Sequence, residues 1–218
     1  MVQHDRIVIE TGTKKVFASA LDWPGWCRSG RTEEEALATL FAYADRYRLV
    51  ADLAGARGVL TVARAPTIAE RLTGNGTTDF GAPDRPAALE REPLTEAECD
   101  RQIRLLTACW ERFDAVAASV SPALRKGPRG GGRDRDGIVA HTLEAERNYV
   151  RRLGVRTAPG TMDSEDGLRQ HRDAVCRAIR GMNDSGEDPR GWPLRYAIRR
   201  AAWHVMDHAW EMEDKDLS

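Results

Sequence analysis

The chain has 218 residues, and its 33 lysines and arginines against 34 aspartates and glutamates give a formal net charge of −1. This balance argues against binding to nucleic acid or to an anionic membrane, because a protein that binds either of them needs a net positive charge. The length predicts one large domain or two small ones, at about 150 residues per domain. No apolar run approaches the roughly 18 residues of a membrane span, no signal peptide opens the chain, and four scattered cysteines favour reduced thiols. We therefore expect a soluble, cytoplasmic protein.

The first half of the chain predicts a small α/β unit. Short β-like runs at residues 7–9 and 16–21 flank Thr11-Gly12-Thr13, a sequence typical of a hairpin turn. Thr32 and Glu35 have the spacing of a capping box, which begins a helix. We expect this helix to end at Gly55 or Gly58, because glycine is a common helix stop, and a further strand to follow at residues 59–62.

The second half predicts four helices with no strand between them. A glycine- and proline-rich stretch from Gly74 to Pro93 indicates a domain boundary. A second capping box, Thr95 with Glu98, follows it. Apolar residues then recur at helical spacing over residues 95–120, 137–153, 164–180 and 193–214, with Gly154 and Gly181 as expected ends. We predict an α+β chain: a small α/β domain at 1–80, a linker at 81–94 and an all-α four-helix bundle at 95–218.

Three of the five histidines lie at informative places. His204 and His208 are four residues apart on the last predicted helix, so their imidazoles share one face and can clamp a divalent metal. Both lie at the edge of that helix's apolar arc, and His141 has the same place on the second helix, so the three rings can meet. The opposite, outward face of the last helix carries the charged residues Arg199, Arg200, Asp207, Glu211 and Asp214, and Trp203 is expected to pack rather than to bind a substrate. Taken alone, two histidines at this spacing are more often solvated or hydrogen-bonded side chains than metal ligands. His4 and His171, the latter among polar residues, are not expected to take part.

These histidines also carry a family resemblance. His141, Glu146, Arg147 and Tyr149 resemble the H-x4-E-R-x-aromatic signature of the DinB-like four-helix bundle superfamily, and Trp203-His204-x3-His208 resembles its H-x3-H. The resemblance covers residues 95–218 and implies that His141, His204 and His208 bind a divalent metal, as in the superfamily's metal-dependent thiol S-transferases. It also implies a low-molecular-weight thiol cofactor such as mycothiol. The mycothiol-dependent isomerases have Glu where this chain has His204, which places it nearer the all-histidine branch.

The ligand set indicates what chemistry to expect. Three neutral imidazoles leave the charge of a metal uncompensated, so a bound water or thiol becomes more acidic. Imidazole suits Zn, Ni, Cu and Fe, and the sequence does not choose among them. Glu146 projects into the apolar arc of the second helix, where orienting a ligand imidazole explains a buried carboxylate. An ion pair between Glu146 and an arginine of the bundle is the alternative.

The first half resembles the HicB-like fold of partial antitoxins. The residues that carry the resemblance run from Val16 to Cys27 and continue with Gly30 and the segment from Thr32 to Leu37. HicB antitoxins usually continue into a DNA-binding segment, whereas this chain continues into the predicted bundle, so operator binding is not expected. The resemblance instead implies a protein-interaction or regulatory role.

A basic, glycine-rich loop joins the first two predicted helices. Its arginines Arg129, Arg133 and Arg135 can hold a phosphate or carboxylate together with backbone N–H groups. A solvated connection between helices is the alternative.

Two functional hypotheses follow. In one, the chain is an enzyme in which a metal activates a small thiol or water for transfer to, or hydrolysis of, a small electrophile. In the other, a HicB-like interaction or regulatory module accompanies a structural or vestigial metal site. Bundles of this kind often pair, so a homodimer is expected in either case.

Overall fold

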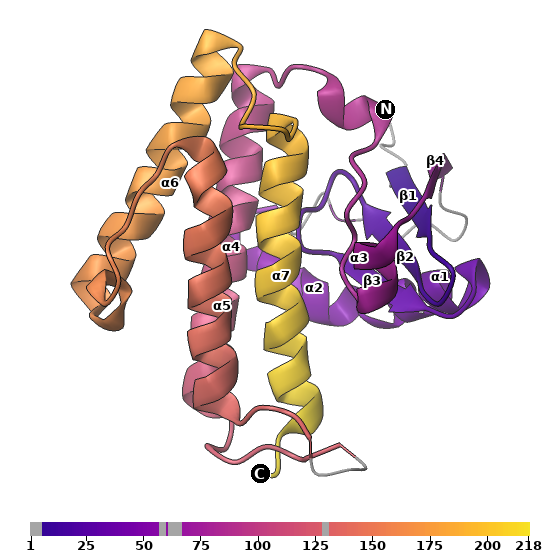
Figure 1. Cartoon of the computed structure of the whole chain (residues 1–218), viewed down its shortest axis with the longest axis vertical. Helices are drawn as coiled ribbons and strands as arrows, with labels where there is room; N and C mark the ends of the chain where they lie inside the picture. Colours follow the sequence, from indigo (N-terminus) through magenta and orange to yellow (C-terminus); the bar gives the residue numbers. More distant parts are fainter. Residues whose placement is uncertain (1–5, 57–59, 61–66, 128–130) are drawn as a thin grey trace.

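The computed structural model describes residues 6–56, 60, 67–127 and 131–218. It has a mixed α+β architecture, with a four-stranded sheet in the first half and long helices in the second (Figure 1). This confirms the predicted α+β class. None of the described helices combines the length and apolarity that crossing a membrane requires.

The sheet has the strand order β3-β2-β1-β4. Strands β1 (Arg6–Thr11) and β2 (Val16–Ala20) form the expected antiparallel hairpin, and β2 pairs in turn with β3 (Cys27–Gly30). Strand β4 (Thr67–Thr73) lies parallel to β1 at the opposite edge. The strand expected at residues 59–62 falls outside the described residues apart from Leu60, which is buried and not in a strand.

The expected first helix is two helices. Thr32 caps α1 (Glu33–Ala42) by accepting a hydrogen bond from the backbone N–H of Glu35. The chain turns at Tyr43, and α2 (Ala44–Leu53) follows. Apolar residues at helical spacing continue through both helices, so the break at Tyr43 left no signal in the pattern.

The segment predicted as a boundary and linker is held against both halves of the chain. It contains the short helix α3 (Gly76–Phe80) and the 3-10 turn η1 (Ala88–Arg91). The buried carboxylate of Glu10 in β1 accepts hydrogen bonds from the backbone N–H groups of Asp84 and Arg85. On the other side, the Glu90 carboxylate pairs with Arg199 of the last helix at 2.5 Å.

The four predicted long helices are present. They are α4 (Glu96–Ser119), α5 (Arg135–Tyr149), α6 (Glu165–Ser185) and α7 (Leu194–Lys215), and the 3-10 turns η2 (Val150–Leu153) and η3 (Thr161–Asp163) lie between α5 and α6. The capping box of Thr95 with Glu98 begins α4 as expected. Gly154 ends η2 in the left-handed conformation, with φ +78°. The expected stop at Gly181 is wrong, because α6 continues to Ser185 and ends at Gly186.

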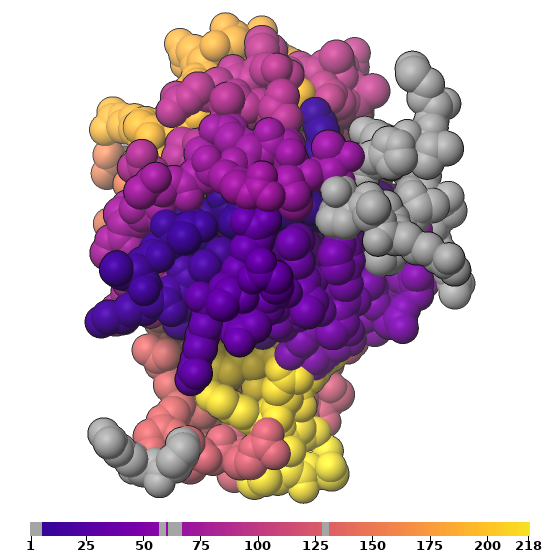
Figure 2. All heavy atoms as spheres, turned by 90° about the vertical axis from the view of Figure 1, so that its right-hand side faces the viewer, coloured from indigo at the N-terminus to yellow at the C-terminus, as the bar shows by residue number. Residues whose placement is uncertain are grey.

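One hydrophobic cluster runs through the sheet and the helices. Trp26 and Tyr47, whose rings stack at 5.6 Å, belong to the same buried cluster as Leu106, Trp110 and Met206. Helices α4, α5 and α7 form the central layer, α6 lies outermost, and the first half covers one face (Figures 1 and 2). The division into two domains therefore stays a prediction.

The cover over α7 overturns one expectation about that helix. Arg199 and Arg200 were expected on its outward, charged face, but both are buried. Arg199 pairs with Glu90, and Arg200 donates a 2.5 Å hydrogen bond to the carbonyl of Pro83. The residues that bury them come from the segment 81–94, so the periodicity of α7 alone could not reveal it.

Candidate metal centre

Helices α5 and α7 bring the three predicted histidines together. His141 lies on α5, and His204 and His208 lie one turn apart on α7. One ring nitrogen of each comes within 4.8 Å of the others, and the ring centroids are 4.6 to 5.3 Å apart. Among the residues that the structure describes, no other group of three or more His, Cys, Asp or Glu side chains converges in this way. The arrangement can hold a metal ion.

A carboxylate on the same helix orients His208. Nδ1 of His208 lies 2.7 Å from Oε2 of Glu211, and the other oxygen of Glu211 accepts from Nζ of Lys215 at 2.5 Å. The hydrogen bond to His208 holds the pKa of Glu211 down at about 2. An ionised carboxylate only accepts, so Nδ1 of His208 carries a proton, and in the neutral form of the ring the lone pair is on Nε2. Such a hydrogen bond fixes the tautomer that a metal ligand needs.

Sequence reasoning missed Glu211, since its helical projection placed it among the outward-facing charges. The signal that identifies it is its spacing of three residues from His208, because side chains at this spacing are neighbours on a helix.

The cluster favours neutral imidazoles. Burial, together with the neighbouring rings of His208 and His141, lowers the pKa of His204 to about 2. Burial is also the main cause that lowers the pKa of His141, followed by His208 and Arg133. Neutral imidazole is the form that binds a metal, so at these two ligands a metal does not compete with a proton near neutral pH.

Aromatic rings enclose His204. The Tyr149 ring of α5 meets it edge-on at 5.5 Å, and the Trp203 ring lies 5.8 Å away. Trp203 itself packs against Phe17 of β2, and Arg200 lies 4.6 Å from the Trp203 ring. Trp203 is buried, in agreement with the expectation that it packs. The first half of the chain therefore supports one wall of the centre.

Glu146 forms no hydrogen bond with His141, His204 or His208, so it does not orient the histidine triad. It is buried, and its Oε1 lies 3.5 Å from Nε2 of His171 and 3.7 Å from Nε of Arg172, both on α6. It lies five residues from His141, about 140° around α5 at 100° per residue. The alternative expected from the sequence, an ion pair with an arginine of the bundle, fits Glu146 better, because Arg172 is its neighbour. His171, expected to be uninvolved among polar residues, is buried and is its other neighbour.

The described arginines among the three predicted anion-binding residues of the glycine-rich loop have separate surroundings. Arg129 lies outside the described residues. Arg135 pairs with Asp136 and donates to the carbonyl of Val120. Arg133 is exposed but near enough to the triad to lower the pKa values of His141 and His204. Of the described arginines in the loop, Arg133 is thus the one whose charge bears on the candidate centre.

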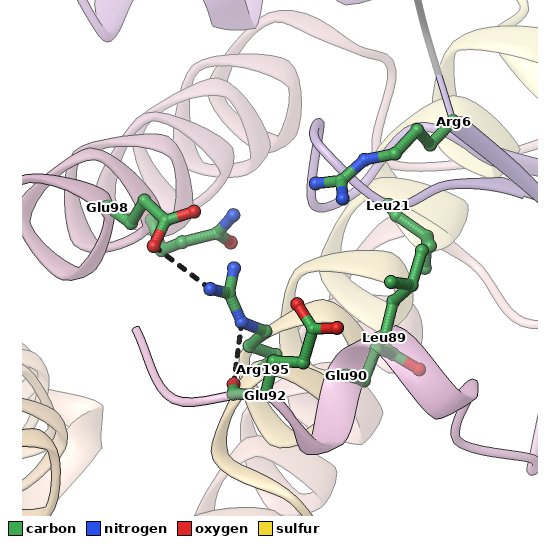
Figure 3. A pocket seen from close by; sticks show the side chains of 8 residues that line it. Arg6, Leu21, Leu89, Glu90, Glu92, Glu98 and Arg195 are labelled. Atoms are coloured by element: carbon green, nitrogen blue, oxygen red, sulfur yellow. Dashed lines mark hydrogen bonds and ion pairs between the residues drawn. The ribbon is translucent and has the colours of Figure 1, made fainter. Parts of the chain in front are cut away.

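A polar cavity of about 40 Å³ lies elsewhere, between β1, η1, α4 and α7 (Figure 3). Arg195 is held there by Glu98 at 3.0 Å and by the carbonyl of Glu92 at 2.9 Å. Arg6 enters from the opposite wall and pairs with Asp22. The space suits water molecules rather than a substrate, and both arginines already have partners, so we do not assign chemistry to it.

Comparisons with protein-family models, curated proteins and solved structures found no match to this chain.

Proposed function

We propose that the chain is a metal-dependent enzyme of the DinB-like kind, acting through His141, His204 and His208 on a small electrophile with a thiol or water as nucleophile. The observation that carries the proposal is the convergence of three imidazoles with no carboxylate or thiolate among the described groups at the same point. A divalent metal on such neutral ligands keeps its positive charge and lowers the pKa of a bound thiol or water.

The surrounding residues support this role. Glu211 holds His208 in the tautomer that presents Nε2, with Lys215 bracing the carboxylate. The charge of Arg133 favours an anionic reactant near the triad. Tyr149 and Trp203 beside His204 exclude water from that side, and the half-buried Tyr149 offers apolar contact to a substrate. A low-molecular-weight thiol, mycothiol being one candidate, is the proposed nucleophile, and a HicB-like first half would shape access.

The first experiment measures metal content. Wild-type protein is loaded with Zn²⁺, Ni²⁺, Fe²⁺ or Co²⁺, desalted and analysed for bound metal, beside His204→Ala, His208→Ala and the control His4→Ala. We expect one metal per chain in the wild type and the control, and loss of metal in both triad variants. Absence of stoichiometric metal from every loaded wild-type sample would rule the proposal out.

A second experiment separates catalytic from structural metal. The Co²⁺-loaded protein is titrated with small thiols while its visible absorption is followed, because a thiolate entering the coordination sphere changes the spectrum. We expect a saturable change. Bound metal with an unchanged spectrum would favour the alternative, an interaction or regulatory module with a structural metal.

A further inference from the structure

A buried arginine without an acidic partner lies one turn of α7 before the two histidines of that helix. Arg200 is 6% exposed, and no described carboxylate forms an ion pair with it. Its neighbour Arg199 is buried as well, but Arg199 pairs with Glu90 at 2.5 Å. A buried charge ordinarily has a partner of opposite charge, because its removal from water is costly. Arg200 therefore keeps a positive charge that no ion pair with a described residue neutralises.

The hydrogen-bond donors of Arg200 are only partly used. Nη1 donates to the carbonyl of Pro83 at 2.5 Å, and Nε is buried without a partner. The remaining nitrogen, Nη2, also has no hydrogen-bond partner within the described ranges, but unlike Nε it is not buried. The Pro83 carbonyl and the Trp203 ring, 4.6 Å from Cζ, fix the guanidinium in place. An anion can thus bind at Nη2 without displacing a hydrogen bond of the fold.

Arg200 shares one face of α7 with the candidate metal ligands. Arg200, His204 and His208 follow one another at spacings of four residues, so each lies about 6 Å along the helix from the last. The Tyr149 ring adjoins both levels, with its centroid 5.5 Å from that of His204 and 5.6 Å from Cζ of Arg200. Burial is the main cause of the low pKa of His204, and the charge of Arg200 is among the further causes. The guanidinium therefore lies beside the candidate centre.

Helix α5 presents a small side chain at this level. His141, Ala145 and Tyr149 repeat at the same spacing on α5, which lies beside α7 (Figure 1). All three are only half-buried, so this face of α5 is accessible. Between the two rings, only the methyl group of Ala145 projects from α5 on this face. A reactant held at the histidines can therefore extend past Ala145 to Arg200.

We propose that Arg200 binds a carboxylate of the small electrophile on which the centre acts, and that it thereby determines the substrate class. This assignment rests on the proposed function, since it places the reacting end of the substrate at the histidine triad. The carboxylate accepts from Nη2, and roughly 6 Å, about one helix turn, separates it from the reacting end. One negative charge matches the one unpaired charge of Arg200, whereas a phosphate ester would bring a second.

The first test uses the metal-free full chain, so it does not depend on metal binding. Butyrate, butyramide and ethyl phosphate are titrated while NMR follows the indole N–H signal of Trp203, which is assigned by its loss in Trp203→Phe. An anion bound at Arg200 shifts this signal, because the Trp203 ring lies 4.6 Å from the guanidinium carbon. We expect a saturable shift with butyrate, with butyramide binding at least tenfold and ethyl phosphate at least threefold more weakly.

Two variants locate the binding. Arg200→Gln should weaken butyrate binding tenfold or more, and Arg200→Lys, which keeps the charge but not the planar fork, about threefold or more. The exposed Arg151→Gln is the control and should bind butyrate like the wild type. No saturable shift with butyrate, equal binding of butyramide, tighter binding of ethyl phosphate, or full affinity in a folded Arg200 variant would each overturn the proposal. The ligand comparisons in the wild type remain decisive if both variants unfold.

A second test connects Arg200 to the candidate metal centre. The Co²⁺-loaded protein is titrated with 4-mercaptobutyrate and with 4-mercaptobutanamide while its visible spectrum is followed. We expect the acid to bind at least fivefold more tightly than the amide, and Arg200→Gln to remove this difference without changing the metal content. A spectral response of equal affinity to both thiols would contradict the role of Arg200 and leave the metal chemistry intact. A silent spectrum together with butyrate binding in the first test would instead count against the proposed function alone.

Discussion

His208 is oriented by a residue of its own helix, which makes the effect of orientation separable from ligation. Glu211 touches only the far side of the ring, at Nδ1, while Nε2 remains for a metal. Because Glu211 contributes no ligand atom to the triad, its removal leaves all three imidazoles in place. It therefore tests whether the geometry of the ring, and not merely its presence, controls metal binding.

We predict that Glu211→Gln weakens metal affinity without abolishing it. The neutral amide holds Nδ1–H less strongly and permits the other tautomer, so affinity should fall roughly 10- to 100-fold. Competition with a chromophoric chelator measures the affinity. Glu144→Gln, an exposed change on α5, is the control. Affinity equal to the wild type would show that His208 needs no orienting carboxylate.

Arg133 offers a second residue-scale prediction. It lies near enough to influence His141 and His204, yet it is exposed and supplies no ligand. Arg133→Gln should leave metal content unchanged and weaken the binding of azide or thiocyanate to the Co²⁺-loaded protein by ~3-fold at low salt, with a smaller effect at high salt. The visible spectrum reports binding. The exposed Arg151→Gln serves as control, and equal weakening there would contradict a local effect.

Helical periodicity sufficed to predict that the three histidines meet, because it specifies which side of each helix faces its neighbour. It could not supply the partners of buried charges that lie on other elements. Glu146 meets His171 and Arg172 only because α6, which packs mainly against α4, carries these two side chains to it, and the polar neighbours of His171 along the chain concealed its burial. That the triad binds a metal stays a prediction.

The same limit applies to whole elements. The long helices and the hairpin could be predicted, since capping boxes and apolar spacing are local signals. Strand β4 could not: its sequence TIAERLT is largely polar, and it is a strand because β1 pairs with it. The prolines of the segment 81–94 predicted a linker. In the structure, Glu10 accepts a hydrogen bond from its backbone, and Arg199 forms an ion pair with its Glu90 side chain.

The contact between η1 and α7 yields a prediction about stability. Glu90 and Arg199 are both buried, and their ion pair joins the predicted linker to the last helix. Glu90→Gln would leave the guanidinium buried with a weaker partner, so the free energy of unfolding should fall by about 3 kcal/mol. Urea denaturation measures the change, with the exposed Glu92→Gln as control. A loss no larger than in the control would mean that the pair does not hold the segment in place.

At the scale of the whole molecule, the question is whether the sheet and the helices unfold together. The turn at Gly25 connects them most directly, because it inserts between α4 and α7 with φ +94°. A Cβ at this position would lie 2.8 Å from Sγ of Cys109 and 2.9 Å from Cγ of Met206. No side chain fits at this position unless the side chains of Cys109 and Met206 shift.

We predict that Gly25→Ala destabilises the sheet and the helices as one unit. Backbone strain and overpacking should together cost roughly 3 kcal/mol. Gly55→Ala is the matched control, since Gly55 also has a positive φ, +67°, but no atom lies within 4 Å of its added Cβ; only the strain of about 1 kcal/mol applies there. Tryptophan fluorescence and far-ultraviolet circular dichroism follow urea unfolding. Because one hydrophobic cluster spans both halves, the two signals should shift together to lower urea in Gly25→Ala. Two separate unfolding transitions, of which only one moves to lower urea in Gly25→Ala, would instead establish two domains that unfold independently.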